Sequence, residues 1–363
     1  MGLAIGIIGL PNVGKSTLFN ALTGAQNAAA ESYPFCTVEP NRAVVPVPDE
    51  RLEGIAAITE PEKVTPTTIQ FVDIAGLVEN ASKGEGLGNQ FLSHVAEADA
   101  LAHLVRCFDD ENVAHVAAEL APVRDMEVVE TELVLRDIEL LERRVEDLSR
   151  EARANKDALP RLQAAEGLLG HLNEGEPIMT FPDKSAEAVR PLLEDVPFVT
   201  DKPMIYVANV GETAADACVR SVREHAEERG FSALSVEAKI EEELIGMDPE
   251  ERREFLHIYG LEESALERLI RTGYETLGLI SFFTIQSNQV QAWTVPEGCG
   301  AARAAGRIHT DFEEGFIRAQ VMAYEDFIRL GGEHECRQAG LERTVGRDYE
   351  VRDGDIIRFL FSD

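Results

Sequence analysis

The sequence Gly9-Leu-Pro-Asn-Val-Gly-Lys-Ser16 follows the apolar run 3–8 and leads directly into the helical pattern 17–22. In this order of strand, glycine-rich loop and helix, backbone N–H groups converge on a bound phosphate. Lys15 can then reach the β- and γ-phosphates, and the Ser16 hydroxyl can ligate Mg²⁺. A chance Gly-Lys-Ser turn is the alternative, and the flanking strand and helix argue against it. The sequence predicts a nucleoside-triphosphate site with these contact residues: Asn12, Val13, Gly14, Lys15, Ser16 and Thr17.

Composition places the chain among globular proteins, with an unusually large negative charge. It has 363 residues, 44% of them hydrophobic, and a formal net charge of −32. No charge-free apolar stretch reaches the roughly 20 residues of a membrane span, so we expect no membrane association and a cytoplasmic location. The acidity opposes simple binding to nucleic acid. Because Arg also outnumbers Lys, a high-salt cytoplasm that screens the charge is a further hypothesis.

The cysteines carry no recognisable pattern. None of the five forms a Cys-x-x-Cys pair, which argues against a zinc site and against a disulfide framework. We therefore expect free thiols in a reducing compartment at Cys36, Cys107, Cys218, Cys299 and Cys336.

Strand-like runs at 3–8, 69–72, 101–107 and 204–208 alternate with helical patterns, which predicts a mostly parallel α/β sheet. Such sheets bind ligands at the carboxyl ends of their strands. Between 128 and 173 apolar residues instead recur four and three apart on a charged background. We interpret this region as an inserted antiparallel helical hairpin; two ordinary amphipathic helices packed on the sheet are the alternative. The apolar positions are Val134, Ile138, Leu141, Val145, Leu148, Leu162, Ala165, Leu169 and Leu172.

The last part of the chain predicts a small α+β module. Asp248-Pro249 is typical of a helix start, with Asp as N-cap and Pro in the first helical position. A helical region then runs to about Leu279. Element lengths beyond it suit a compact β-grasp-like fold. Short strands are expected at 280–285, 290–295, 319–323 and 356–361, around one helix at Phe312–Arg318.

Asp73-Ile-Ala-Gly76 follows the second strand. In a phosphate-loop protein an Asp in this position holds Mg²⁺ through water, and the Gly N–H senses the γ-phosphate. The glycine-rich segment 76–88 is expected to rearrange when that phosphate leaves. Upstream, Thr37 is the candidate to complete the Mg²⁺ shell, and a plain surface threonine is the alternative. The predicted metal-binding residues are Ser16, Thr37 and Asp73.

Leu77 stands where Ras-like enzymes place the glutamine that orients the attacking water, and leucine cannot do this. Another side chain must position the nucleophile. Candidates near this end of the sheet are Asn89, Gln90, His94 and His115. We favour His115 as the catalytic partner of Lys15, because imidazole suits water orientation and proton transfer.

Asn12 places an amide oxygen in the phosphate loop, beside the β- and γ-phosphates. It is a candidate ligand for K⁺, whose charge would replace that of an arginine finger. A hydrogen bond within the loop is the alternative.

Asn209-Val-Gly-Glu212 follows the strand 204–208, where GTPases carry Asn-Lys-x-Asp. In those proteins the Asp pairs with guanine and the Lys stem covers the ring. With Val210 and Glu212 in these positions the pairing is displaced by one methylene, and an unpaired polar group in a binding site lowers affinity. Adenine is then a plausible base, with Asn209 available to its N6 and N7. Ser235 lies in a weaker match to the loop that closes over the base.

Together these motifs resemble the YchF (Obg-like ATPase) family. The resemblance extends over the whole chain and rests on 9–16, 33–41, 73–91 and 209–212, while 305–319 and 353–355 look like that family's TGS domain. It implies a G domain, a helical coiled-coil insertion and a β-grasp TGS domain, a preference for ATP over GTP, and association with ribosomes. The family also has a hydrophobic residue in the position of Leu77 and a loop histidine that matches His115.

We therefore expect an α/β P-loop NTPase fold. The G domain would occupy 1–127 and 199–280, the helical insertion 128–198 and the TGS domain 281–363. The expected function is a ribosome-associated switch that hydrolyses ATP with Mg²⁺ and K⁺. Its contacts would lie on the large subunit or the 70S particle, with RNA met by the helical and TGS domains. Two alternatives stay open: a GTPase of the Obg type, and a regulatory binding module that nucleotide merely stabilises.

Overall fold

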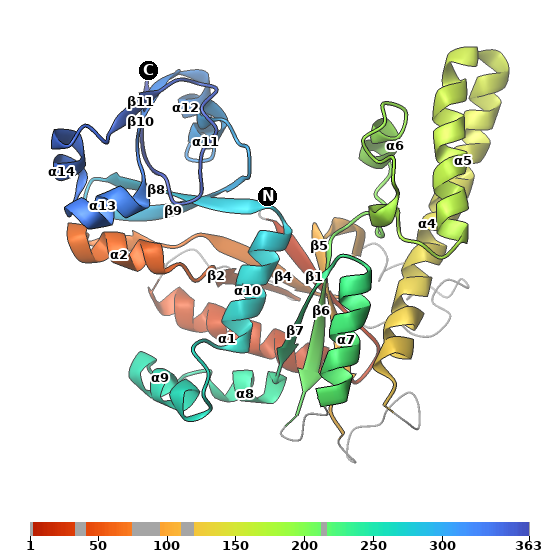
Figure 1. Ribbon diagram of the computed structural model, residues 1–363, viewed down its shortest axis with the longest axis horizontal. Helices are drawn as coiled ribbons and strands as arrows, with labels where there is room; N and C mark the ends of the chain where they lie inside the picture. Colours follow the sequence, from red (N-terminus) through yellow and green to blue (C-terminus); the bar gives the residue numbers. More distant parts are fainter. Residues whose placement is uncertain (1–2, 33–40, 75–94, 110–119, 212–215, 363) are drawn as a thin grey trace. The chain divides into compact units, whose positions relative to one another are not determined.

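The computed structural model describes residues 3–32, 41–74, 95–109, 120–211 and 216–362 (Figure 1). Within these ranges the chain divides into two compact units. The first contains residues 3–28, 41–43 and 70–266, and the second contains residues 29–32, 44–69 and 267–362. None of the described helices combines the length and the apolar character that crossing a membrane requires.

A six-stranded sheet forms the centre of the first unit (Figure 1). Its order is β2-β4-β1-β5-β6-β7, and the neighbours from β4 to β7 pair in parallel. The bounds are β1 Ala4–Ile8, β2 Arg42–Pro46, β4 Thr68–Asp73, β5 Ala100–Cys107, β6 Met204–Val210 and β7 Ser232–Val236. β1 and β5 are buried along their whole length and are mostly apolar, and the polar residues His103 and Arg106 of β5 are buried as well. The four predicted strands and the parallel sheet are confirmed.

Helices connect the strands and continue the first unit beyond β7. They are α1 Lys15–Ser32, α7 Asp216–Glu228, α8 Ala238–Glu243 and α9 Pro249–Ile258, while α10 Ala265–Thr276 belongs to the second unit from Glu267 on. The predicted start of α9 is confirmed: the Asp248 side chain accepts hydrogen bonds from the N–H groups of Glu250 and Glu251, and the Glu251 side chain bonds back to the Asp248 N–H. This reciprocal pair satisfies donors that a helix start otherwise leaves free.

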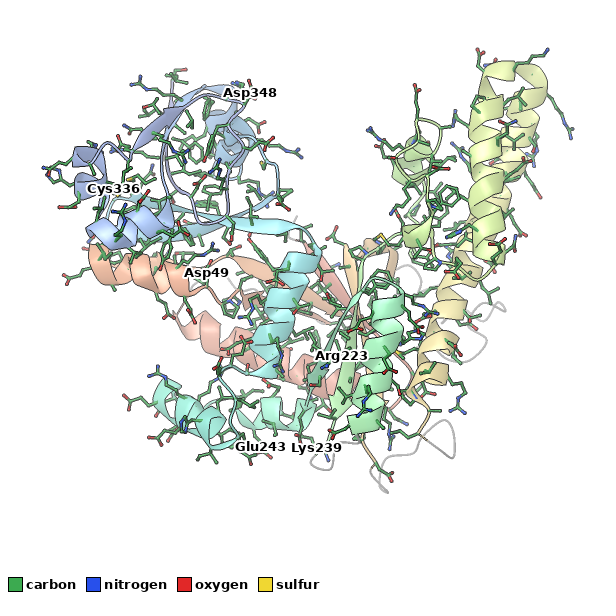
Figure 2. The ribbon with its side chains drawn as sticks, in the orientation of Figure 1. Asp49, Arg223, Lys239, Glu243, Cys336 and Asp348 are labelled. Carbon is green, nitrogen blue, oxygen red and sulfur yellow. A yellow bond between two sulfur atoms is a disulfide. The ribbon has the colours of Figure 1, made fainter. Side chains whose placement is uncertain are left out.

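The predicted helical hairpin is confirmed. It consists of α4 Pro122–Ala154, a short 3₁₀ turn at Lys156–Ala158 and α5 Leu159–Asn173, and α6 Arg190–Asp195 follows on the returning chain. Side chains of α4 and α5 meet between the two helices (Figure 2). The predicted seam is their core: Val134, Leu141, Leu148, Ala165 and Leu172 are buried, and Ile138, Val145, Leu162 and Leu169 pack against them.

A buried carboxylate fastens α4 to the returning chain. Asp137 accepts hydrogen bonds from the Val199 N–H at 3.0 Å, the Thr200 N–H at 2.8 Å and the Thr200 hydroxyl at 2.6 Å. Burial raises the pKa of Asp137 to about 6, although these hydrogen bonds oppose the shift. Three donors on one carboxylate give the insertion a defined attachment point.

The second unit contains another six-stranded sheet, in the order β11-β10-β12-β8-β9-β3. Its strands are β3 Lys63–Thr65, β8 Leu279–Gln286, β9 Gln289–Pro296, β10 Phe316–Met322, β11 Arg343–Val345 and β12 Ile356–Phe361. Its helices are α2 Glu50–Thr59, α11 Ala301–Gly306, α12 Thr310–Glu314, α13 Tyr324–Leu330 and α14 Glu333–Gln338. The four predicted strands are confirmed.

The predicted helix Phe312–Arg318 is wrong in its second half. α12 ends at Glu314, where the Gly315 N–H bonds to the Asp311 carbonyl, and residues 316–318 begin β10. The Phe316 side chain is buried in the core of the sheet, and its strand pairs with β12. Tertiary packing therefore overrides a local pattern that favours helix.

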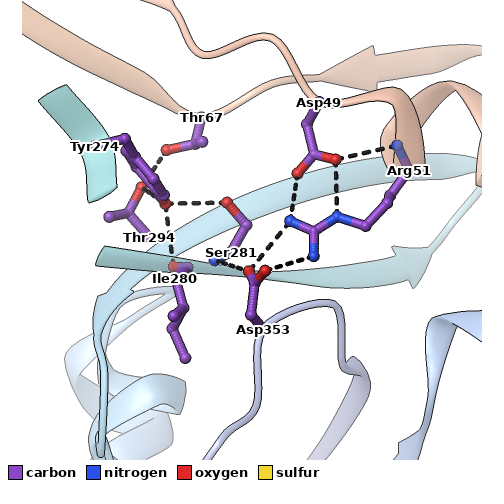
Figure 3. A network of polar contacts seen from close by, with 8 residues as sticks. All are labelled: Asp49, Arg51, Thr67, Tyr274, Ile280, Ser281, Thr294 and Asp353. Carbon is purple, nitrogen blue, oxygen red and sulfur yellow. Dashed lines mark hydrogen bonds and ion pairs between the residues drawn. The ribbon is translucent and has the colours of Figure 1, made fainter. Parts of the chain in front are cut away.

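Residues 44–69 cluster with this second unit, although the two ends of the segment lie in β2 and β4 of the first sheet. β3 pairs in parallel with β9, and Figure 3 shows two polar anchors nearby. Arg51 bonds both Asp49 and Asp353, with Nη1 2.7 Å from Asp353 Oδ2. Tyr274 Oη lies 3.1 Å from the Thr294 hydroxyl, which also contacts the Thr67 hydroxyl. Segments far apart in the sequence thus share one polar network.

Candidate functional site

The phosphate-binding loop lies between the carboxyl end of β1 and the first turn of α1. Gly9 and Gly14 have φ angles of +148° and +100°, which favour glycine. A Cβ atom at Gly9 would lie 2.4 Å from the Leu104 carbonyl oxygen, and one at Gly14 would lie 2.2 Å from Asn209 Nδ2. The loop packs so closely on β5 and β6 that both glycines are required by space as well as by backbone conformation.

Lys15, the first residue of α1, is buried against this loop. Its Nζ donates hydrogen bonds to the carbonyl oxygens of Gly9 at 3.0 Å and Leu10 at 2.7 Å. Burial lowers the Lys15 pKa to about 8, and the Asp73 carboxylate opposes the shift. With that pKa most of the amine is protonated at pH 7. The loop therefore holds a cation where phosphate oxygens would bind.

Asp73 is the last residue of β4 and lies opposite Ile7 of β1. Burial raises the pKa of its carboxyl group, and the Lys15 charge opposes the shift. Its Oδ1 is buried and accepts no hydrogen bond from the residues that the structure describes. An unsatisfied carboxylate oxygen is a suitable ligand for Mg²⁺, which prefers oxygen donors. The Ser16 side chain, exposed in the first turn of α1, is the second described candidate.

Asn209 ties the phosphate loop to the loop after β7. It is only 4% exposed, its Nδ2 donates to the Val13 carbonyl at 2.8 Å, and its Oδ1 accepts from the Ala238 N–H at 3.2 Å. The sequence suggested contacts with N6 and N7 of adenine. In the structure each end of the amide already has a protein partner, so Asn209 joins the phosphate loop to the start of α8.

The other described contact residues gather near the same edge of the sheet. Val210 ends β6 opposite Cys107, and Ser235 lies in β7 opposite Ala208. Val13 is buried, whereas Asn12 and Thr17 keep accessible side chains. Asn12 also adopts the left-handed conformation, with φ of +63°. The sheet thus brings the predicted phosphate and base segments together from positions about 200 residues apart.

Several predicted functional residues lie outside the described part of the chain. Among them are the metal candidate Thr37, the catalytic candidate His115 and the base-recognition candidate Glu212. Leu77 and the alternative water-positioning residues Asn89, Gln90 and His94 lie outside it as well. Their roles stay predictions.

The expectation that all cysteines are free is wrong for two of them. Cys107 at the end of β5 and Cys218 in α7 form a disulfide, with Cα atoms 5.7 Å apart and a sequence separation of 111 residues. The fold brings them together, and no local spacing could reveal the pair. Cys299 and Cys336 are free, as predicted, and both are buried. Cys36 lies outside the described residues.

A buried polar cluster between α4 and the sheet was not predicted. Glu130 Oε1 accepts from the Tyr206 hydroxyl at 2.6 Å and lies 2.7 Å from His225 Nε2, while Oε2 lies 3.1 Å from Arg229 Nε. Burial would raise the Glu130 pKa, but these hydrogen bonds and charges outweigh it and lower the pKa to about 2. The cluster links the root of the helical insertion to β6 and α7, and its members lie too far apart in the sequence to form a motif.

Comparisons with known proteins cover the whole chain. Residues 4–136 match the family model described as 50S ribosome-binding GTPase, and residues 279–362 match the YchF GTPase C-terminal model, described as a protein of unknown function (DUF933). The chain is 48% identical over 365 residues to Ribosome-binding ATPase YchF of Escherichia coli O157:H7. It is 42% identical over 368 residues to the protein of the same name from Bacillus subtilis (strain 168). Both alignments cover 100% of each chain.

Solved structures agree with this assignment. The YchF GTPase of Schizosaccharomyces pombe matches with a TM-score of 0.89 and 34% identity, over 99% of this chain and 98% of that one. A GTP-binding protein from Pyrococcus horikoshii OT3 shows the same fold, with a TM-score of 0.63 and 19% identity over 99% and 100% of the two chains. The predicted G domain, helical insertion and TGS-type module are thereby confirmed. Full-length identity above 40%, together with the phosphate loop and this arrangement of elements, shows that the chain belongs to the YchF family.

Proposed function

We propose that this protein hydrolyses ATP and uses its nucleotide state to control binding to the ribosome. The observation that carries the proposal is the phosphate loop with buried Lys15, next to Asp73, whose Oδ1 is unsatisfied within the described residues. The full-length relatives named Ribosome-binding ATPase YchF support both the nucleotide and the partner.

The catalytic roles follow from charge and position. Lys15 would neutralise charge on the β- and γ-phosphates, and Ser16, Thr37 and Asp73 would hold Mg²⁺. The ion, when bound, supplies further positive charge to the phosphate oxygens. His115 would orient the attacking water, since leucine replaces the usual glutamine. We expect His115→Ala to lower kcat about 100-fold with an unchanged Kd for ATP; an intact kcat would contradict the assignment.

Asn12 would bind K⁺ beside the phosphates. The exposed side chain of Asn12 supports this proposal. Replacing K⁺ by Na⁺ in the ATPase assay should then lower the rate, because the smaller ion fits a K⁺ site poorly. Equal rates in the two salts would remove the cation from the proposal.

ATP would be preferred over GTP because Val210 and Glu212 replace the Lys and Asp of the guanine code. Ser235 would contribute to the loop that closes over the base. The solved relative titled a YchF GTPase keeps guanine as the competing candidate. Competition of ATP and GTP for one fluorescent nucleotide decides between them: tighter binding of GTP would overturn the reading of Glu212.

The nucleotide signal would reach the second unit through the chain itself. Thr37 and Asp73 flank the segment 44–69, and that segment belongs to the second unit through β3 and the contacts of Arg51 and Thr67. A shift of Thr37 or Asp73 when the γ-phosphate leaves would therefore displace the segment 44–69 of that unit.

The partner would be the large subunit or the 70S particle of the ribosome, in the cytoplasm, with RNA contacts from the helical insertion and the TGS module. Cosedimentation with isolated subunits and 70S particles tests this, using ATP, ADP and a non-hydrolysable ATP analogue. We expect binding that differs between ADP and the analogue. Equal binding in all states would contradict a switch. Negligible turnover with and without ribosomes would favour the regulatory binding module.

A further inference from the structure

Apolar side chains are exposed together at the end of α9 in the first unit. Ile258 is 79% exposed, Tyr259 is 57% exposed, and Leu261 follows at 38%. The Phe255 ring is only partly buried and lies against the Tyr259 ring, with centroids 4.8 Å apart. We call these four residues the α9 patch. Single exposed apolar side chains are ordinary, but a contiguous group is typical of an interaction surface.

The α9 patch is held in a defined conformation. Gly260 has a φ angle of +69°, and the Leu261 N–H donates to the carbonyl of buried Leu256 at 2.9 Å, as in a Schellman motif. At its other end the helix is closed by the capping box of Asp248 and Glu251. Because hydrogen bonds cap both ends of α9, the patch is ordered before a partner binds. The entropy cost of ordering it therefore lowers the affinity only slightly.

The surroundings of the patch are strongly acidic. Residues 248–263 contain six acidic side chains and two arginines, a net charge of −4 with histidine neutral (2 − 6). Glu251 and Glu254 precede Ile258 by seven and four positions, so they share its face of the helix, and both are exposed. One of the two arginines is engaged within the unit, since Arg252 Nη2 donates to Ser264 Oγ at 3.0 Å.

We propose that the α9 patch docks a Lys- and Arg-rich protein segment that also carries apolar side chains. Ile258 and Tyr259 would be covered by the apolar side chains of the segment, while its cations would face the surrounding carboxylates. RNA is a poor occupant, because its phosphates would meet a surface of the same charge. The inference rests on the proposed function in one respect, because it assigns the docked segment to a protein of the ribosome.

The surface can be tested without ribosomes. A synthetic amphipathic Lys/Leu peptide is titrated into the full-length protein and followed by fluorescence anisotropy. The double variant Ile258→Gln/Tyr259→Gln keeps the charge and removes the apolar anchors, so its Kd should rise at least about tenfold. Glu254→Lys should weaken binding too. Ile317→Gln, at a side chain 59% exposed in β10, is the matched control and should stay within about twofold. Unfolding curves show that each variant folds. Equal Kd values for the double variant and the wild type would overturn the proposal.

Ribosome cosedimentation then tests the identity of the partner. The double variant should bind ribosomes at least about tenfold more weakly than the wild type, and Glu254→Lys should bind more weakly as well. Stronger binding by Glu254→Lys would assign RNA to the surface and refute a basic protein segment. A wild-type protein that does not sediment with ribosomes would refute the proposed function, while the peptide titration still decides what the α9 patch binds.

Discussion

Asn209→Ala should weaken nucleotide binding even though Asn209 need not touch the nucleotide. In the structure its amide joins the Val13 carbonyl to the Ala238 N–H, at 2.8 Å and 3.2 Å, and both of these residues are buried. Alanine leaves one buried acceptor and one buried donor unpaired, and each costs about 1–3 kcal/mol. We take about 2 kcal/mol as the lower bound of the cost of both unpaired groups. If nucleotide binding must restore the order of both loops, this cost corresponds to a rise of about 30-fold in Kd.

The assay separates this indirect role of Asn209, which acts through hydrogen bonds to the phosphate loop, from a direct contact with the base. Kd is measured by calorimetry for ATP and, by competition, for inorganic tripolyphosphate, which has no base. If the hydrogen bonds of Asn209 order the phosphate loop, Asn209→Ala should bind both ligands more weakly. If Asn209 instead contacts the base, the variant should bind only ATP more weakly. Asn173→Ala, at an exposed residue that ends α5, is the control and should change neither Kd. Equal Kd values of the wild type and Asn209→Ala for tripolyphosphate would refute the reasoning.

Three further predictions rest on single features. Gly14→Ala should abolish ATP binding in the same calorimetric assay, because its Cβ atom would clash with Asn209; Gly230→Ala, also at positive φ but with no atom within 4 Å of the new Cβ, should retain it. Burial lowers the His103 pKa to about 4, so its contribution to stability is full above pH 6.5 and is lost as pH falls towards 4. Urea unfolding should show wild type losing about 2 kcal/mol more than His103→Gln between pH 7 and pH 5, and equal losses would contradict this. Reduction of the Cys107–Cys218 bond should lower the free energy of unfolding by about 2–5 kcal/mol and raise the titratable thiols of the denatured chain from three to five (5 − 2 = 3); five thiols before reduction would exclude the bond.

Features that depend on short stretches of chain could be predicted from the sequence. The phosphate loop is one, because its glycines, Lys15 and the strand and helix around it are consecutive and each has a local physical reason. The seam of the helical hairpin is another, since a spacing of four and three places Leu141 and Leu148 on one side of α4 whatever the rest of the fold does. The capping box at Asp248 is equally local.

Predictions from local patterns were wrong or missing where pairing with a distant segment decides the structure of a residue. Residues 316–318 have a helical pattern, but pairing with β12 and burial of Phe316 place them in a strand. The segment 44–69 gave no sign that it belongs with residues 267–362, because β3 finds its partner β9 more than 200 residues further along. A pairing of this kind is decided by the shape of the assembled sheet.

The sequence by itself therefore determined that this protein has a nucleotide site of the P-loop type, an atypical base motif and an inserted hairpin. Only the tertiary structure decided which side chains act on one another: Asn209 on the phosphate loop, Cys107 on Cys218, and Glu130 on His225. The physical reason is that periodicity and turn chemistry act over a few residues. Contacts across a sheet depend instead on strand order and register, which are set by packing of the whole unit.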